Sequence, residues 1–201
     1  MKLKVFALMG FLLFMFACAP STKLIGTWMD PELSPETLAP FNKVLVIARI
    51  NTETSNRIAE DKIVASMVTP AVPSYSIILP GDTNAVELDA KLQKEGIDGL
   101  VVMRLTEVNK SLNYTPPSYS GGYYGGYYGY RGYYRMGYSS PGYLSEDQTF
   151  YVETSIYSLI TGKLMWSGTT SSLNPTELRQ TLDEIIYAVK VELAKKGMIK
   201  E

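Results

Sequence analysis

Short apolar runs alternate with amphipathic runs through the first half of this chain, and this alternation is the strongest constraint on its fold. The runs Val44–Ala48 and Leu100–Leu105 are mostly apolar and rich in β-branched residues, as in strands that are covered on both faces of a sheet. Between them we expect a helix from Ser55 or Asn56 to about Val68, a short strand over Tyr75–Leu79, and a helix that starts at the capping box of Asn84 and Glu87, runs to Lys94 and ends at Gly96. This half therefore predicts a βαβαβ unit whose last strand continues toward Val108.

The second half of the chain predicts an antiparallel hairpin followed by a terminal helix. Two segments with strand character, Gln148–Leu159 and Lys163–Thr170, flank a Thr-Gly turn. The terminal helix is expected to have Asn174 as its N-cap and to end at Gly197. Together these elements predict a single α/β domain over residues 23–201, a mixed β-sheet with helices packed on it, to which Lys23–Met29 can add an edge strand.

The segment Tyr114–Tyr143 interrupts this pattern. It contains eleven tyrosines and eight glycines and has no period typical of a helix or a strand, so we expect no regular element in it. One interpretation is a solvated low-complexity insertion. The other is an arm that contacts glycan, another envelope protein or copies of itself, because tyrosine is a flat amphipathic contact residue and arginine adds cation–π contacts. The candidate contact residues are Tyr123, Tyr124, Tyr127, Tyr128, Tyr130, Arg131, Tyr133, Tyr134 and Arg135.

The amino terminus resembles a bacterial lipoprotein signal. Lys2 and Lys4 precede an uncharged run of thirteen residues, Val5–Ala17, which is too short to span a bilayer. The four residues that end at Cys18, Met-Phe-Ala-Cys, resemble the lipobox, and Cys18 is the only cysteine in the chain. We therefore expect residues 1–17 to be removed as a signal peptide and Cys18 to carry a diacylglycerol thioether, with a third acyl chain such as palmitate on the new amino terminus.

The lipid site also predicts a location. Ala19, where an aspartate would favour the inner membrane, resembles the sorting pattern of outer-membrane lipoproteins and indicates a periplasm-facing tether. Residues 18–22 would form a leash of about 15 Å if they are extended. Once Lys2 and Lys4 are removed with the signal peptide, 17 basic and 20 acidic residues remain, so the mature chain is a poor candidate for nucleic acid binding.

Catalytic residues are scarce in this sequence. It contains no histidine, and Cys18 is assigned to lipid, which excludes histidine-dependent triads, cysteine nucleophiles and ordinary zinc sites. The carboxylate pairs Glu60-Asp61 and Asp183-Glu184 are expected on solvated helix faces, although an envelope enzyme that acts on glycan through carboxylates stays an alternative. Trp166 is expected in the core, and Trp28 is expected to anchor the amino-terminal segment. No cofactor and no metal site are expected.

Several short motifs together resemble a group of uncharacterised bacterial envelope lipoproteins. They are Thr27-Trp28 before Asp30-Pro31, the strand Lys43–Ile50, Arg57 with Glu60, Ser74-Tyr75, Gly96–Gly99, the Tyr/Gly-rich loop, and Tyr157 with Thr161–Ser167. The order of elements is also similar to the amino-terminal domain of the TolB translocation protein, to the curli secretion lipoprotein and to the lipoprotein activators of penicillin-binding proteins. The resemblance implies a non-catalytic, protein-binding role.

We therefore expect a lipid-anchored periplasmic accessory or scaffold protein of the cell envelope that contacts its partners through the Tyr/Gly-rich loop. The expected partners are the membrane, through the lipid anchor, and an envelope protein or peptidoglycan. A self-assembling lipoprotein that forms a homo-oligomer is the other alternative to the scaffold.

Overall fold

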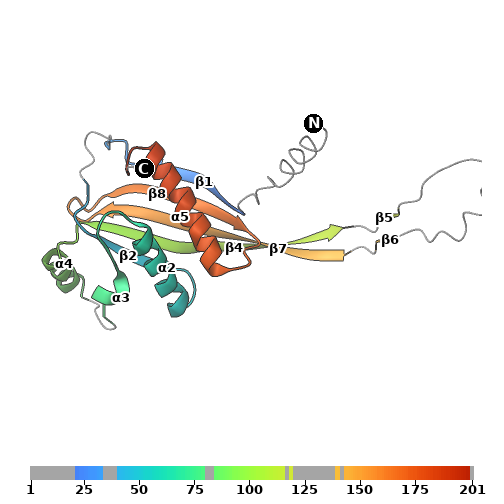
Figure 1. The fold of residues 1–201 in the computed structure, drawn as a ribbon, viewed down its shortest axis with the longest axis horizontal. Helices are drawn as coiled ribbons and strands as arrows, with labels where there is room; N and C mark the ends of the chain where they lie inside the picture. Colours follow the sequence, from blue (N-terminus) through green and yellow to red (C-terminus); the bar gives the residue numbers. More distant parts are fainter. Residues whose placement is uncertain are drawn as a thin grey trace, which may run out of the picture.

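The computed structural model describes residues 21–33, 40–79, 84–115, 118–119, 139–140 and 143–199. Most of them build a mixed sheet of six strands in the order β1-β8-β7-β4-β2-β3 (Figure 1). The strands are β1 (Thr22–Met29), β2 (Val44–Arg49), β3 (Ala71–Pro73), β4 (Gly99–Thr115), β7 (Tyr143–Ser158) and β8 (Leu164–Leu173), and a separate pair is formed by β5 (Ser118–Tyr119) and β6 (Ser139–Ser140). The helices are α2 (Glu53–Ser66), α3 (Ser74–Ile77), α4 (Ala85–Lys94) and α5 (Leu178–Lys195). The predicted α/β class is confirmed.

The sheet has a parallel part and an antiparallel part. β3, β2 and β4 are parallel to one another, which agrees with the predicted βαβαβ unit, whereas the pairs β4–β7, β7–β8 and β8–β1 are antiparallel. The predicted hairpin turn lies between β7 and β8, where Gly162 has a φ of +68° that suits glycine. The predicted edge strand is also present, because β1 pairs with β8 from Thr22 to Met29.

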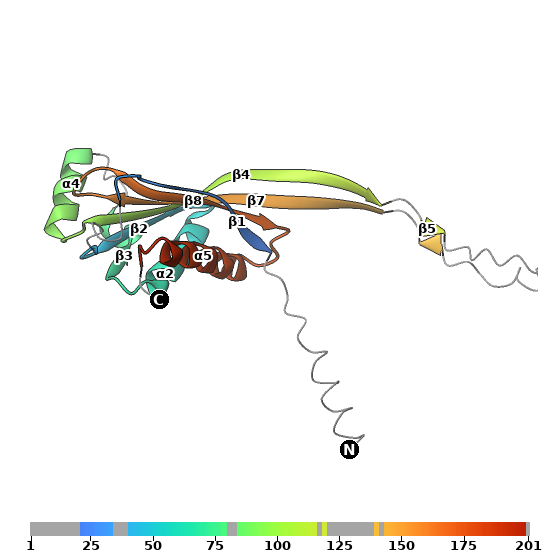
Figure 2. The ribbon, with the colours of Figure 1, turned by 90° about the horizontal axis from the view of Figure 1, so that it is seen from above.

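The main core lies on the face of the sheet that α2 and α5 cover (Figure 2). Alternate residues of β2 and β4 point into it, namely Val44, Val46, Ala48, Val101 and Met103. They pack against the apolar stripe of α5, which includes Leu182, Ile185 and Val189. Trp166 of β8 is fully buried there, as predicted. Gly168 lies beside it, and a Cβ on Gly168 would be 2.3 Å from Cη2 of Trp166, so the indole occupies the space that a side chain would need.

A smaller apolar cluster lies on the opposite face. Leu45, Leu92 and Ile97 form its buried centre, and α4 covers this face over β2 and the beginning of β4. Further along, the face carries polar side chains: Arg104 Nη2 donates to Glu153 Oε2 at 2.8 Å. The hydrogen bond and the charge of Arg104 hold the pKa of Glu153 below its ordinary value, against the effect of partial burial.

Two predicted element positions were wrong. Residues Tyr75–Leu79 are not a strand: the edge strand β3 ends at Pro73, and Ser74–Ile77 form the short helix α3. Proline cannot donate to a sheet ladder and is suited to an edge position, and the Ile78 amide closes the helical turn on the Ser74 carbonyl at 2.7 Å. α2 is capped by Thr52 instead of Ser55 or Asn56, because the Oγ1 of Thr52 accepts from the Ser55 amide, and it ends at Ser66, close to the predicted end at about Val68.

The terminal helix also begins later than predicted. Its N-cap is Glu177, whereas Asn174 has a φ of +46° and lies in the loop between β8 and α5. The predicted glycine ends are confirmed: Gly96 follows α4 with a φ of +70°, and Gly197 follows α5 with a φ of +72°.

Candidate partner-binding ribbon

β4 and β7 continue beyond the six-stranded sheet as a two-stranded ribbon (Figures 1 and 2). In the described structure β2 pairs with β4 as far as Arg104, and β8 pairs with β7 from Thr149 onward, but β4 and β7 stay paired to the end at Thr115 and Tyr143. The six residue pairs beyond Thr149 extend about 20 Å, at about 3.3–3.4 Å per residue. We call residues 110–115 and 143–148 the ribbon.

A β-bulge at the base of the ribbon decides which side chains face which way. The register shifts between Leu105 and Glu107, so Thr106 is an extra residue on β4, and its Oγ1 donates to the Tyr151 carbonyl at 3.1 Å. Because side chains alternate along a strand, this extra residue brings Val108, and then Leu112, to the side that faces α5. Without it, Glu107 and the polar residues that follow would occupy that side.

The ribbon consequently has its exposed apolar side chains on one face, where they lie among charged ones. Its helix-side face carries Leu112 and Tyr114, which are 75% and 64% exposed. An ion pair of 3.1 Å between Lys110 Nζ and Glu146 Oε1 crosses the same face. The opposite face is polar, and Asn113 donates to Asp147 there. Exposed apolar side chains that are grouped on one face of a projecting element are typical of a surface that contacts a partner.

The strand pairing continues past the ribbon. The β5–β6 pairs, Ser118 with Ser140 and Tyr119 with Ser139, keep the register of the ribbon, because each strand advances by three residues from the Thr115–Tyr143 pair. The prediction that Tyr114–Tyr143 contains no regular element was therefore wrong at both ends of that segment. Polar and apolar residues alternate from Ser111 to Tyr114, and this weak pattern becomes a strand once the partner strand is in register.

The predicted contact residues lie outside the described residues, between β5 and β6 along the chain. They are Tyr123, Tyr124, Tyr127, Tyr128, Tyr130, Arg131, Tyr133, Tyr134 and Arg135. The structure adds the paired strands that precede and follow them in the chain, and with these strands the exposed side chains of Leu112 and Tyr114. Leu112 was not predicted from the sequence. The signal that could have found it is the alternation that resumes after the bulge.

Asn174 fixes the base of the ribbon. Its Oδ1 accepts from the Gln148 amide at 2.7 Å, and its own amide donates to the Gln148 carbonyl at 2.7 Å. Its Nδ2 donates to Asp147 Oδ1 at 2.8 Å. Asparagine tolerates the left-handed backbone conformation found here better than most residues do. The residue that the sequence assigned to a helix cap therefore joins the end of β8 to the point where β7 leaves the sheet.

The first described residues are fixed at the same end of the sheet. Thr22 is buried, and its Oγ1 lies 2.8 Å from Ser172 Oγ, while Ser172 in turn pairs with Phe150 of β7. Ser21 Oγ donates to Glu184 Oε2 of α5 at 2.9 Å. Desolvation raises the pKa of Glu184, but the hydrogen bonds from Thr22 and Ser21 outweigh it and hold this pKa below its ordinary value.

Cys18 and residues 1–17 lie outside the described residues, so lipidation and removal of the signal peptide stay predictions. Only three residues separate Cys18 from β1 in the sequence. Within the part of the chain that the structure describes, no helix is both long and apolar enough to cross a membrane.

The acidic pairs behave differently from one another. Asp183 is exposed and forms an ion pair with Lys62, as expected of a solvated helix face. Glu60 was predicted to be solvated as well, and this prediction was wrong: its side chain is buried and accepts hydrogen bonds from the Ala48 amide and from Ser74 Oγ. The described residues contain no group of three or more His, Cys, Asp or Glu side chains that could hold a metal ion.

Trp28 lies at the other end of β1, beside a shallow cavity of about 390 Å³ that Lys163 and Glu32 also line. Trp28 was expected to anchor the amino-terminal segment, but its side chain is 48% exposed. The segment is held by the backbone pairing of β1 with β8. Lys163 Nζ and Glu32 Oε2 are 2.8 Å apart, which raises the pKa of Lys163 through that hydrogen bond and the carboxylate charge.

Comparison with known proteins gives distant structural matches. No protein family model matches the chain, and no curated protein matches its sequence. A PelC dodecamer from Paraburkholderia phytofirmans is 11% identical, with a TM-score of 0.42, and the match covers 90% of this chain and 99% of that one. Lipoprotein GNA1162 from Neisseria meningitidis is 14% identical, with a TM-score of 0.40, over 76% of this chain and 98% of that one.

TolB from Acinetobacter baumannii is also similar, at 13% identity and a TM-score of 0.33, over 88% of this chain and 31% of that one. The similarity to TolB that the sequence predicted is thus found as a distant structural one. The predicted similarity to the curli secretion lipoprotein and to the penicillin-binding protein activators stays a prediction.

Proposed function

We propose that this protein is a lipid-anchored, non-catalytic accessory or scaffold protein of the bacterial cell envelope, and that the ribbon and the Tyr/Gly-rich segment that follows it contact its partner. The observation that carries this proposal is the position of two features at one end of the sheet. Thr22 pairs with Ser172, and Ser172 pairs with Phe150 at the base of the ribbon. The chain that comes from Cys18 therefore enters the domain beside the point where the ribbon leaves it.

This arrangement limits where the partner can be. If Cys18 is lipidated, the leash before Thr22 is about 15 Å at most, at about 3.3 Å per residue, so the base of the ribbon is held close to the membrane. The partner is then an envelope protein or peptidoglycan at or near the same membrane, which we place at the periplasmic side of the outer membrane. Leu112 and Tyr114 are the described side chains that we expect it to cover.

Site-specific photo-crosslinking in cells that make the lipidated protein tests this proposal. A photoreactive residue at position 112 should give crosslinked adducts, and the same residue at position 160 serves as a matched control, because Ile160 is a 78% exposed apolar side chain in the β7–β8 turn. Deleting residues 118–142 should leave a folded domain and abolish the adducts. Equal adducts from both positions, or adducts that persist after the deletion, would contradict the proposal.

A second candidate is self-assembly through β1. This strand lies at the edge of the sheet, its outer side has no partner strand within the described residues, and Ile25 is 56% exposed on it. An edge of this kind can pair with another copy of the chain, and a further charged side chain in addition to exposed Lys23 should oppose such pairing. Light scattering should then show a mass that rises with concentration and falls to that of a monomer in Ile25→Lys. A constant monomer mass would exclude this candidate.

A further inference from the structure

A second cavity, of about 230 Å³, lies at the carboxyl ends of the parallel strands β2 and β3. It is separate from the ribbon, and its walls come from three elements that the topology brings together. Arg49 ends β2, Asn56 and Arg57 belong to the first turns of α2, and Tyr75 belongs to α3, which follows β3 directly.

The topology explains why a cavity forms at this place. α2 connects β2 to β3 across the main-core face of the sheet, whereas the connection from β3 to β4 passes β2 in the opposite direction and places α4 on the other face. In open α/β sheets, ligands bind in the crevice outside the carboxyl ends of neighbouring strands whose connections leave on opposite faces. β2 and β3 are such a pair, and the cavity occupies that crevice.

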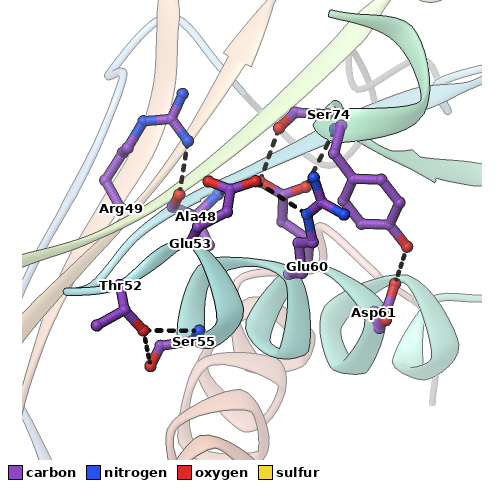
Figure 3. Close-up of polar contacts among 10 residues, drawn as sticks. Ala48, Arg49, Thr52, Glu53, Ser55, Glu60, Asp61 and Ser74 are labelled. Atoms are coloured by element: carbon purple, nitrogen blue, oxygen red, sulfur yellow. Dashed lines mark hydrogen bonds and ion pairs between the residues drawn. The ribbon is translucent and has the colours of Figure 1, made fainter. Parts of the chain in front are cut away.

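Buried Glu60 holds the walls of the cavity together (Figure 3). Its Oε1 accepts from the Ala48 amide at 2.9 Å and from Ser74 Oγ at 2.7 Å, and its Oε2 accepts from the Tyr75 amide at 3.4 Å. The carboxylate thus joins β2, α2 and α3 and is 2% exposed. Because protein donors already occupy its oxygens, we assign it a structural role in the cavity.

Two arginines remain available in the cavity, whose lining also includes Asn56 and the carboxylate of Glu53. Arg49 Nη1 donates to the Ala48 carbonyl at 2.9 Å, and Arg57 Nε donates to Glu53 Oε1 at 2.9 Å. A guanidinium has five N–H donors, so within the described structure each arginine keeps most of its donors for a ligand. The Arg57–Glu53 pair is exposed, and such pairs contribute little to stability, so it does not prevent Arg57 from binding an anion.

The Arg57 side chain is held in a defined orientation. Its guanidinium lies over the Tyr75 ring at 5.0 Å from the ring centroid, and Tyr75 Oη donates to Asp61 Oδ1 at 2.6 Å. That hydrogen bond, which orients the ring beneath the guanidinium, is the main cause of a raised Tyr75 pKa. Ile78 and Leu79 supply an apolar wall to the same cavity.

We propose that this cavity binds a small organic oxyanion, a carboxylate or a phosphate ester that carries an apolar group. The oxyanion contacts the guanidinium groups of Arg49 and Arg57, because the planar fork of arginine matches both kinds of oxyanion. The apolar group lies against Ile78 and Leu79. The volume is below the roughly 300–1,000 Å³ of pockets for drug-sized molecules, so the ligand is smaller than these.

NMR titration of the isotopically labelled domain tests this site, with phenyl phosphate and benzoate as probes and benzyl alcohol as the neutral control. The two anions distinguish a phosphate site from a carboxylate site. At least one of them should produce saturable shifts at the amides of Arg49, Arg57 and Tyr75 within a range up to about 50 mM, above the millimolar Kd of weak sites. Saturation by neither anion, or equal saturation by benzyl alcohol, would overturn the proposal.

Arginine variants then assign the contacts. Arg49→Met and Arg57→Met should each weaken binding about tenfold, and Arg57→Lys should weaken it by less, because lysine keeps the charge but loses the fork. The matched control is Arg104→Met, which removes an arginine that is paired with Glu153 on the sheet. Unchanged affinity in both Arg49→Met and Arg57→Met would contradict the proposal. Leu112→Asn in the ribbon should leave this binding intact, which separates the cavity from the proposed partner contact.

Discussion

The paired strands β4 and β7 are covered by helices at one end and uncovered at the other. Within the sheet, Met103 of β4 is 1% exposed beneath the helices of the main core, whereas Leu112, further along the same strand and on the same side, is 75% exposed. The backbone pairing is continuous between them. In the ribbon, the strands are held by backbone pairing without burial, because α2 and α5 cover only the part within the sheet. The exposed apolar side chains of the ribbon are therefore available for contact with a partner.

Truncating the two side chains tests this difference directly. Met103→Ala should lower the free energy of unfolding by about 3 kcal/mol, because it leaves a cavity in a packed core. Leu112→Ala should change it by less than about 0.5 kcal/mol, as is usual for exposed positions. Urea denaturation followed by circular dichroism measures both. Equal losses would mean that another part of the chain covers the ribbon.

Adding a group to the core, instead of removing one, also tests how tightly the covered region is packed. Gly168→Ala places a methyl group 2.3 Å from Cη2 of the fully buried Trp166, so we expect a loss of about 2 kcal/mol in the free energy of unfolding. The matched control is Gly26→Ala on β1, where the added Cβ meets no atom within 4 Å. That variant should stay within about 0.5 kcal/mol of the parent protein. If both glycines tolerate alanine, the packing around Trp166 is looser than described.

The sequence predicted the covered region better than the uncovered one. Val44–Ala48 and the glycines that end α4 and α5 lie where they were expected, because burial on two faces and a positive φ leave local signals in the sequence. Tyr75–Leu79 was assigned wrongly, because the turn there depends on Glu60, which lies fourteen residues from Ser74 in the chain and binds its hydroxyl. The residues next to a glutamate in the sequence do not show whether it is solvated or is buried against donors from distant parts of the chain.

The ribbon and the cavity could not be predicted for a related reason. The bulge at Thr106 changes which side chains face α5, and a bulge is set by the pairing of β4 with β7, not by the residues of β4 alone. Arg49 and Tyr75 meet only because β2 and β3 are neighbours whose connections leave on opposite faces. Both sites depend on contacts between segments that are distant in the sequence.

The junction between the covered and uncovered regions depends on Asn174. Asn174→Ala removes the side-chain hydrogen bonds to Gln148 and Asp147 and places alanine at a φ of +46°, so we expect a loss of about 1–2 kcal/mol. Asn174→Gly loses the same bonds without the backbone strain and should be the milder change by several tenths of a kcal/mol. Hydrogen exchange should increase at the amides of Gln148 and its neighbours in both variants. Unchanged exchange there would show that the ribbon does not need this contact.

The smallest expected effect concerns Glu184, which holds the first described residues beside the base of the ribbon. The hydrogen bonds from Thr22 and Ser21 lower its pKa in the folded protein, despite opposing desolvation. A depressed carboxylate pKa contributes stability that is fully present above the unfolded value of about 4.3 and is lost as the pH falls through the folded value. Glu184→Gln should therefore cost at most about 1 kcal/mol at pH 7 and progressively less in acid.

The measurement is the difference in unfolding free energy between the parent protein and Glu184→Gln from pH 7 down to well below about 4.3, the ordinary pKa of a glutamate. A matched control is Glu177→Gln, which changes a carboxylate of the same helix cap region whose backbone carbonyl, not its side chain, accepts from Thr181. A difference that is specific to position 184 and that shrinks on acidification would mean that Ser21 and Thr22 are held by an ionised group. A difference that is independent of pH would mean that Ser21 and Thr22 are held by the pairing of β1 with β8 alone. The first described residues would then be held as the ribbon is, by hydrogen bonds between backbone groups of neighbouring strands.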